Sequence, residues 1–191
     1  MARMGMTVRV GRNTLQVPDR VFLDANLIID YLVPGQYHRA ATLMMGQLMN
    51  GAVRGLTSVY VSPLVLDEVW WKLAVLRYAR ARKRFPTILP DWNDGTRMGR
   101  AGRKRVFRKY GAYLAAKTND VLQRLAPVNV VSVDARDIPV ALGIMARQSG
   151  SQLPRDALHL AVMQRHRITG IATNDRDFTN VPGIVALPFV S

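Results

Sequence analysis

This chain of 191 residues is 49% hydrophobic, which is sufficient to build the core of one domain spanning residues 1–191. It contains no cysteine, so disulfides and cysteine-based zinc sites are excluded. The 27 Lys and Arg residues outnumber the 13 Asp and Glu residues, and the net charge of +14 indicates a polyanionic partner such as nucleic acid. The alternative is a charge that only maintains solubility.

The first part of the chain predicts a small β-hairpin over residues 6–17, with a turn at Gly11-Arg12-Asn13. A short apolar run over 20–24 then predicts a buried strand that ends in an acid. Hydrophobic periodicity predicts alternating helices and strands for the rest, which is typical of a parallel α/β sheet covered by helices. We expect helices over 27–31, 38–50, 62–84, 103–125, 138–148 and 154–166, and further strands over 128–133, 168–173 and 184–187.

Local signals mark several of the expected boundaries. Ser62-Pro63 is a favourable helix start, with a capping side chain followed by proline. Residues 86–102 contain two prolines and three glycines, so we expect a loop there. Ser149-Gly150 is expected to end the helix before it.

No segment of the sequence suggests export or membrane insertion. Residues 1–12 lack the apolar core of a secretory signal, and no run of 18 apolar residues occurs. We therefore expect a cytoplasmic protein without a membrane partner. Two of the three histidines, His159 and His166, are seven residues apart, unlike the four-residue spacing of a helical zinc pair. Any metal would use oxygen ligands, which favours Mg²⁺ or Mn²⁺.

The few acidic residues fall at informative positions. Asp24 ends the first buried strand, and Asp175 follows the strand expected over 168–173. Ligands bind beyond the carboxyl ends of strands in open parallel sheets, so these two acids are expected in one crevice. Asp156 lies in the first turn of its helix, and Glu68, the single glutamate of the chain, lies in the second turn of another.

Each of these acids also has a structural alternative. Asp156 is favourable near a helix start because of the helix dipole, Asp175 suits a turn, and Glu68 can pair with Lys72. Asp24 is harder to explain in this way, because an unpaired buried charge is very costly. Clustered carboxylates repel one another, and a divalent cation among them would resolve that conflict.

Four motifs then occur in a specific order: VFLDAN at 21–26, SPLVLDEV at 62–69, DALHLA at 156–161 and ATNDRDF at 172–178. In this order they resemble the PIN-domain ribonucleases, and most closely the VapC-type toxins of toxin–antitoxin pairs. The resemblance covers roughly residues 20–190.

The resemblance implies a three-layer α/β/α fold with a short parallel sheet. It implies that Asp24, Glu68, Asp156 and Asp175 hold one or two Mg²⁺ or Mn²⁺ ions, that Asn26 helps to position the site, and that Thr173 and Asp177 support it. The activity that it implies is the endonucleolytic hydrolysis of RNA. Toxins of this type form homodimers and are neutralised by a small antitoxin protein.

Two segments depart from the family pattern: an N-terminal extension over residues 1–19 and an enlarged segment over residues 77–109. The second segment holds 12 basic and 2 acidic residues, which is +10 of the total charge of +14. We expect it to bind RNA, or else to form a mobile basic lobe, and a solvated loop without a partner is the alternative. The candidate RNA-binding residues are Arg80, Arg82, Lys83, Arg84, Arg103, Lys104, Arg105 and Arg108.

Three aromatic and histidine positions receive simpler interpretations. Trp70 and Trp71 are expected in the core or a dimer interface, and nothing in the sequence supports base stacking by them. His159, one helical turn after Asp156, is expected to have a structural role.

Two other functions compete with a metal-dependent nuclease. The first is a non-catalytic RNA-binding module of the PIN type, in which the basic segment binds RNA and the acids are vestigial. The second is a phosphatase resembling the haloacid dehalogenases, which need Asp-x-Asp after the first strand. The sequence here is Asp24-Ala25-Asn26, so the second acid of that motif is missing.

Overall fold

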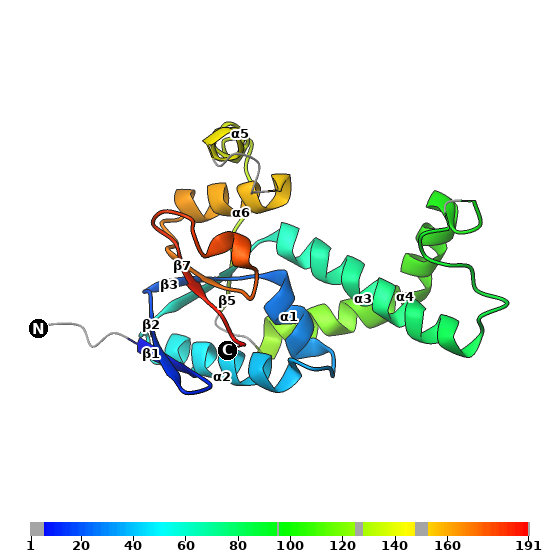
Figure 1. The fold of residues 1–191 in the computed structure, drawn as a ribbon, viewed down its shortest axis with the longest axis horizontal. Helices are drawn as coiled ribbons and strands as arrows, with labels where there is room; N and C mark the ends of the chain where they lie inside the picture. Colours follow the sequence, from blue (N-terminus) through cyan, green and yellow to red (C-terminus); the bar gives the residue numbers. More distant parts are fainter. Residues whose placement is uncertain (1–5, 95, 125–127, 148–152, 191) are drawn as a thin grey trace, which may run out of the picture.

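The computed structural model describes residues 6–94, 96–124, 128–147 and 153–190 (Figure 1). Its centre is a five-stranded sheet in the order β5-β4-β3-β6-β7, and all neighbouring strands are parallel. The strands are β3 (Arg20–Leu23), β4 (Ser58–Val61), β5 (Val128–Val130), β6 (Gly170–Ala172) and β7 (Val185–Leu187). The predicted short parallel sheet is therefore confirmed.

Helices cover the sheet on two sides, with α5 and α6 above it and α1 and α2 below it in Figure 1. The resulting three-layer α/β/α arrangement confirms the expected fold class. The helices are α1 (Ala25–Leu32), α2 (His38–Val53), α3 (Pro63–Arg84), α4 (Gly99–Arg124), α5 (Asp137–Arg147) and α6 (Pro154–Arg165). Within the described residues, no helix is both long enough and apolar enough to cross a membrane.

Strand β3 lies at the centre of the sheet because its side chains are apolar on both faces. Val21, Phe22 and Leu23 are completely buried, as expected for a strand between two helical layers. Pairing with β4 on one side and β6 on the other leaves no free edge. The residue that follows this strand, Asp24, is thereby fixed at the middle of the sheet's carboxyl edge.

The hydrophobic pattern predicts no strand over residues 58–61, and the structure corrects this by forming β4 there. The four residues Ser58–Val61 alternate between half-buried and buried, and a run this short gives almost no periodic signal. Its strand conformation depends on parallel pairing with β3 and β5, which lie far from it in the sequence. Tertiary pairing therefore decides the structure here.

Several predicted boundaries also move. Helix α4 begins at Gly99 instead of 103, and β5 ends at Val130 instead of 133. Strand β6 begins at Gly170 instead of 168. The expected helix ends at Leu125 and at Gln148-Ser149-Gly150 lie outside the described residues.

The predicted N-terminal hairpin is present and packs against α2. Strands β1 (Met6–Val10) and β2 (Asn13–Val17) pair antiparallel, and Gly11 adopts a φ of 58° in the turn. The Gln47 amide side chain exchanges hydrogen bonds with the backbone of Arg9, with donor–acceptor distances of 2.6 and 3.1 Å. This hairpin covers the outer end of α2, away from the carboxyl edge of the sheet (Figure 1).

The basic segment 77–109, here called the basic lobe, projects from the sheet on the outer halves of α3 and α4 (Figure 1). It has a small apolar core of its own, in which Tyr78, Met98 and Val106 are buried and Trp92 packs against them. The Tyr78 hydroxyl donates to the Pro90 carbonyl at 2.8 Å, which ties α3 to the connecting segment. The lobe is thus a packed structure and not a solvated loop.

Candidate functional site

The carboxyl ends of three neighbouring strands bring polar residues together. Asp24 follows β3, Ser62 follows β4 and Thr173 follows β6, and these three strands are adjacent in the sheet. The Asp24 backbone N–H donates to the Ala172 carbonyl at 3.3 Å, which continues the β3–β6 ladder. This edge is where the sequence analysis expected a ligand site.

Asp24 is the most constrained acid of the edge. Its side chain is only 8% exposed and caps α1, accepting a hydrogen bond from the Ala25 N–H at 2.6 Å. Its second oxygen, Oδ2, accepts a hydrogen bond from the Thr173 hydroxyl at 2.5 Å. Burial, together with the negative charges of Glu68 and Asp175, raises the pKa of Asp24 to about 6 despite these two bonds. The site therefore disfavours this charge unless a cation compensates it.

Thr173 links the other members of the site. Its Oγ1 accepts from the Asn26 amide at 3.0 Å and from the Asp175 backbone N–H at 2.9 Å, and it donates to Asp24. A hydroxyl has one donor and two acceptor positions, so its capacity is fully used. Asn26 and Thr173, both expected to support the site, thus hold Asp24 and Asp175 in a single network.

The structure places the other expected acids around this network. Glu68 on α3 and Asp175 after β6 both act electrostatically on Asp24. Burial raises the pKa of Asp156 on α6, and Asp175, Glu68 and Asp177 raise it further. Glu68 and Asp175 therefore lie within electrostatic range of both Asp24 and Asp156. The charge of Asp177 raises the pKa of Asp156, whereas the charge of Asp175 raises the pKa of both Asp24 and Asp156. Asp175 is therefore the more central of the two.

Two of the structural alternatives also hold. Asp156 accepts a hydrogen bond from the Leu153 N–H at 3.2 Å at the start of α6. Asp175 accepts one from the Asp177 N–H at 2.9 Å and caps the short 3₁₀ helix Arg176–Phe178. These caps fix the orientation of each carboxylate, which is compatible with a second role as a ligand.

The alternative for Glu68 is wrong. Its carboxylate lies 3.5 Å from the guanidinium of Arg155 on α6, and no Glu68–Lys72 ion pair forms in the described structure. Arg155 was not among the predicted site residues, although it directly precedes Asp156 in the first turn of its helix. It brings a positive charge to the rim of the acidic cluster.

The donor set suits a hard divalent cation. The candidate ligands are carboxylate oxygens, the type that Mg²⁺ and Mn²⁺ prefer. Within the described residues, no three acidic or histidine side chains already stand close enough together to hold a metal ion. Burial is the main cause of the raised pKa values of Asp24 and Asp156, and the charges of the neighbouring carboxylates add to it.

Ser62 adds a buried polar atom to this edge. Its side chain is fully buried, and Oγ has no hydrogen-bond partner among the described residues. The expected side-chain cap on α3 does not form, although Ser62 occupies the capping position. Ser62 was not among the predicted site residues, because its position at this edge depends on the pairing of β4 with β3.

A cleft of about 570 Å³ opens directly beside Glu68. It runs from the acidic site toward the basic lobe and lies between α3, the start of α6 and the segment that carries Trp92. Its lining combines polar, cationic and aromatic side chains, namely Asn26, Ile29, Glu68, Trp71, Lys72, Val75, Trp92, Asn93, Arg103 and Arg155.

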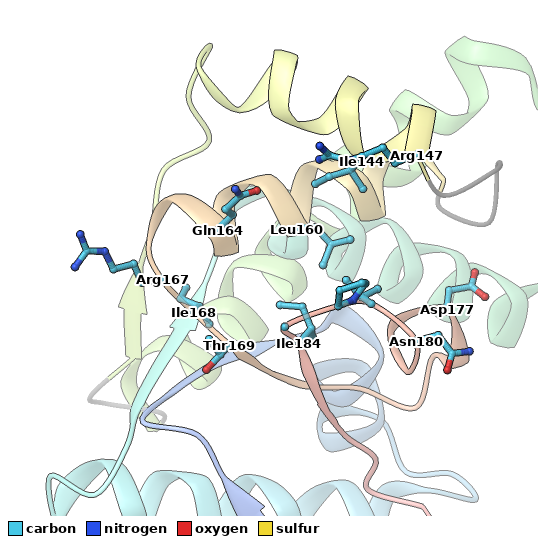
Figure 2. A pocket seen from close by; sticks show the side chains of 13 residues that line it. Ile144, Arg147, Leu160, Gln164, Arg167, Ile168, Thr169, Asp177, Asn180 and Ile184 are labelled. Carbon is cyan, nitrogen blue, oxygen red and sulfur yellow. The ribbon is translucent and has the colours of Figure 1, made fainter.

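A larger cavity of about 830 Å³ lies elsewhere, between α5, α6 and the segment before β7 (Figure 2). Ile144, Leu160 and Ile184 give it an apolar lining, and Arg147 and Arg167 lie at its rim (Figure 2). Of the expected site residues, only Asp177 contributes to its lining. Its size therefore does not identify it as the site of chemistry.

The predicted RNA-binding residues divide into three groups. Arg80, Lys83, Arg84, Lys104, Arg105 and Arg108 are exposed on the basic lobe. Arg82 instead pairs with Asp91 at 2.8 Å within the lobe. Arg103 lies over the Trp92 ring at 5.9 Å and lines the cleft beside Glu68. Of the predicted group, Arg103 alone lines the cleft that also contains Glu68.

His159 is buried, as its structural interpretation predicts. It is 2% exposed, its ring packs against Phe22 at 5.6 Å, and neither ring nitrogen has a hydrogen-bond partner among the described residues. Burial, together with the positive charge of Arg155, lowers the pKa of His159 to about 4. The imidazole is therefore neutral at physiological pH.

A comparison with protein-family models now adds to this geometry. The model of the PIN domain matches residues 21–184, which includes strands β4, β5 and β6, all of β3 except Arg20, and all four candidate acids, and ends just before β7. The chain belongs to the PIN domain family. The N-terminal hairpin lies outside the matched part of this PIN domain.

Solved structures resemble this PIN domain at low sequence identity. VapBC2 from Rickettsia felis, bound to a DNA fragment from its promoter, is 10% identical, and the match covers 88% of this chain and 98% of that one with a TM-score of 0.52. VapC20 of Mycobacterium tuberculosis, described as a toxin that cleaves the sarcin–ricin loop, is 18% identical over 83% and 92% of the two chains, with a TM-score of 0.49. DNA-bound VapBC from Salmonella typhimurium is 14% identical over 89% and 98%, with a TM-score of 0.48. The Rickettsia match supports the fold.

No match was found among curated proteins.

Proposed function

We propose that this PIN domain is an endoribonuclease that uses Mg²⁺ or Mn²⁺ to hydrolyse RNA phosphodiester bonds. The observation that carries the proposal is the environment of Asp24. This carboxylate is buried and held by Thr173 and Ala25, and it faces the charges of Glu68 and Asp175. A divalent cation held by Asp24, Glu68, Asp156 and Asp175 would lower the pKa of the attacking water and neutralise charge on the scissile phosphate.

The residues of the chain have separable roles in this proposal. The Thr173 network orients Asp24 and Asp175, and the two caps orient Asp156 and Asp175. Arg155, at the rim of the cleft, is placed to hold an oxygen of the RNA phosphate. Water adds to phosphorus and the bond to the 3′-oxygen breaks, so the products carry a 5′-phosphate and a 3′-hydroxyl.

We further propose that the protein is the toxin of a toxin–antitoxin pair, acts as a homodimer and is neutralised by a small antitoxin protein. The similarity in fold to a VapBC complex supports this assignment, together with the order of the four sequence motifs. A short reading frame next to its gene would encode the antitoxin.

A non-catalytic RNA-binding module is the second candidate, and one observation favours it. The Arg155 guanidinium already neutralises part of the Glu68 charge, as in a site that has lost its metal. Intact Asp24 and its hydrogen-bond network favour the enzyme, because a vestigial site has no reason to keep a buried carboxylate whose charge is unfavourable.

The test compares Asp24→Asn with Asp19→Asn. Both positions flank β3, Asp24 at its carboxyl end and Asp19, which is exposed, at its amino end. We expect Asp24→Asn to lower kcat/KM for RNA cleavage by more than about 100-fold, beyond the 10–100-fold typical of groups that only orient ligands. Asp19→Asn should cleave like the parent.

A second readout is thermal unfolding with added MnCl₂, which should stabilise the parent and Asp19→Asn but not Asp24→Asn. Cleavage that is equal in all three proteins would refute the assignment of the site. RNA binding by the parent without cleavage and without stabilisation by Mn²⁺ would instead establish the non-catalytic module.

A further inference from the structure

The face of α3 that carries Glu68 continues into the basic lobe as an aromatic and cationic surface. Glu68, Trp71, Lys72 and Val75 are spaced by three, four and seven residues, so they share one helical face. All four line the same cleft. Trp71 lies one helical turn beyond Glu68, about 5 Å along the axis, which places it close to the acidic site.

Trp71 has an unusual environment for its size. Its side chain is 42% exposed, although two other rings support it. Trp92 contacts it edge-on at 5.4 Å, and Phe107 lies against it at 5.5 Å with 32° between the ring planes. Trp71 also lines a second hollow of about 340 Å³ together with Lys104 and Phe107. A rigid ring that remains open to solvent between two hollows is a surface on which a flat ligand can stack.

The charges around the cleft indicate what kind of flat ligand binds there. Lys72, Arg103 and Arg155 line it, against Glu68 as its single acid. Neither Lys72 nor Arg103 forms an ion pair with any described residue, and Arg103 Nε is shielded from solvent without a hydrogen-bond partner. Unpaired cations beside an open aromatic ring match a phosphate attached to a base.

We propose that the cleft between α3 and the Trp92 segment binds an unpaired RNA nucleotide next to the scissile phosphate, with its base stacked on Trp71 and its phosphate held by Lys72 and Arg103. The cleft volume of about 570 Å³ is within the range of small-ligand sites. Bases in a duplex are already stacked on their neighbours and unavailable to such a ring, so the subsite selects single-stranded RNA. This inference rests on the proposed function for its position in the reaction, but the binding itself does not require cleavage.

The neighbouring tryptophan provides a matched control. Trp70 is also exposed, at 38%, but it lies on another face of α3, where its indole N–H donates to the Thr118 hydroxyl at 2.6 Å. It lines a separate hollow with Thr118 and Leu114, outside the cleft that contains Glu68. The same substitution at 70 and 71 therefore changes two faces of one helix.

Binding is measured in the Asp24→Asn background with fluorescently labelled single-stranded RNA and with the same RNA as a duplex. A set of single strands, each lacking the base at one different position, completes the comparison. We expect Trp71→Ala to weaken single-strand binding by about 10–100-fold, as is typical for the loss of one stacked base. Trp70→Ala should bind like its background, and Trp71→Phe should recover most of the loss. One of the abasic strands should bind more weakly than the intact strand to proteins that keep Trp71, but equally well to Trp71→Ala.

The phosphate contacts have their own measurement. Lys72→Gln and Arg103→Gln should each lower the slope of log Kd against log salt by about one, because each removes one phosphate contact. Arg12→Gln, which removes an exposed charge in the turn of the N-terminal hairpin, should leave the salt slope and the difference in affinity between intact and abasic RNA unchanged.

The inference is overturned if Trp70→Ala and Trp71→Ala weaken RNA binding equally, or if proteins that keep Trp71 bind intact and abasic strands with the same affinity. It is also overturned if Trp71→Ala loses duplex binding and single-strand binding to the same extent. Circular dichroism melting curves of each variant exclude misfolding, and Trp71→Phe preserves the ring if Trp71→Ala does not fold. Failure of the proposed function is seen separately, as a parent protein that binds but does not cleave.

Discussion

The Thr173 hydroxyl donates a hydrogen bond to Asp24 across two neighbouring strands, with 2.5 Å between Oγ1 and Oδ2. The two residues are 149 positions apart in the sequence. Because Oγ1 also accepts from Asn26 and from the Asp175 N–H, its single proton is directed toward Asp24. One hydroxyl therefore sets the orientation of the most buried acid of the site.

Replacing Thr173 with valine tests this role. Valine keeps the branched shape but removes the hydroxyl, so Asp24, the Asn26 amide and the Asp175 N–H each lose a hydrogen-bond partner. We expect kcat/KM and Mn²⁺ affinity to fall by roughly 10–100-fold, the usual cost of losing an orienting group behind a metal ligand. Thr173→Ser keeps the hydroxyl and should retain most of both. A valine variant with parental Mn²⁺ affinity would show that Thr173 does not position Asp24.

His159 makes the protein sensitive to acid. Its pKa is about 4 in the folded protein against 6.5 for an exposed histidine, because burial disfavours the charged ring. Between pH 6.5 and pH 4, His159 is therefore protonated in the unfolded chain but not in the folded protein. The free energy of unfolding falls as the pH decreases through this window, by up to about 3 kcal/mol.

His159→Leu should remove that acid sensitivity. The variant eliminates two unpaired ring nitrogens, so its free energy of unfolding should also rise at pH 7, by roughly 1–3 kcal/mol. Urea unfolding from pH 4 to pH 8 measures both effects, and His38→Gln is the control that should keep the acid-dependent loss. A strong decrease in RNA cleavage in His159→Leu, with the fold intact, would contradict the structural role assigned to this histidine.

The ion pair between Asp137 and Arg165 fastens α5 to α6. Asp137 is 1% exposed, and its two oxygens lie 2.8 and 3.0 Å from the Arg165 guanidinium. The Arg165 hydrogen bonds lower the pKa of Asp137 below its value of 3.8 in the unfolded chain. The stability that the ion pair adds is therefore present above pH 3.8 and is lost as the pH falls through the lower pKa of the folded protein.

Asp137→Asn should therefore lower the free energy of unfolding at pH 7 by about 1.5–3 kcal/mol, the range for a hydrogen bond to a charged group. Asp134→Asn, which breaks an exposed pair with Arg136, should cost much less. Differential scanning calorimetry at pH 7 compares the two variants. Equal losses of unfolding free energy in the two variants would show that the buried Asp137–Arg165 pair contributes no more to stability than the Asp134–Arg136 pair.

Much of the candidate site was predictable because its signals are local. The run Val21-Phe22-Leu23 is apolar at every position, so a strand buried on both faces and ending at Asp24 could be read directly from the sequence. The N-terminal positions of Glu68 and Asp156 in their helices follow from proline and hydrophobic spacing. These features depend on residues a few positions apart, and the sequence by itself determined them.

The partners of these residues were decided only by the tertiary structure. Strand β4 exists because β3 and β5 pair with it, and that pairing places Ser62 beside Asp24. Arg155 reaches Glu68, and Trp92 reaches Trp71, because helices and a connecting segment that are distant in sequence pack at one edge of the sheet. Hydrophobic periodicity specifies which face of an element is buried but not which element lies against it. The choice of Thr173 as the partner of Asp24 therefore depended on strand order, which only the folded chain defines.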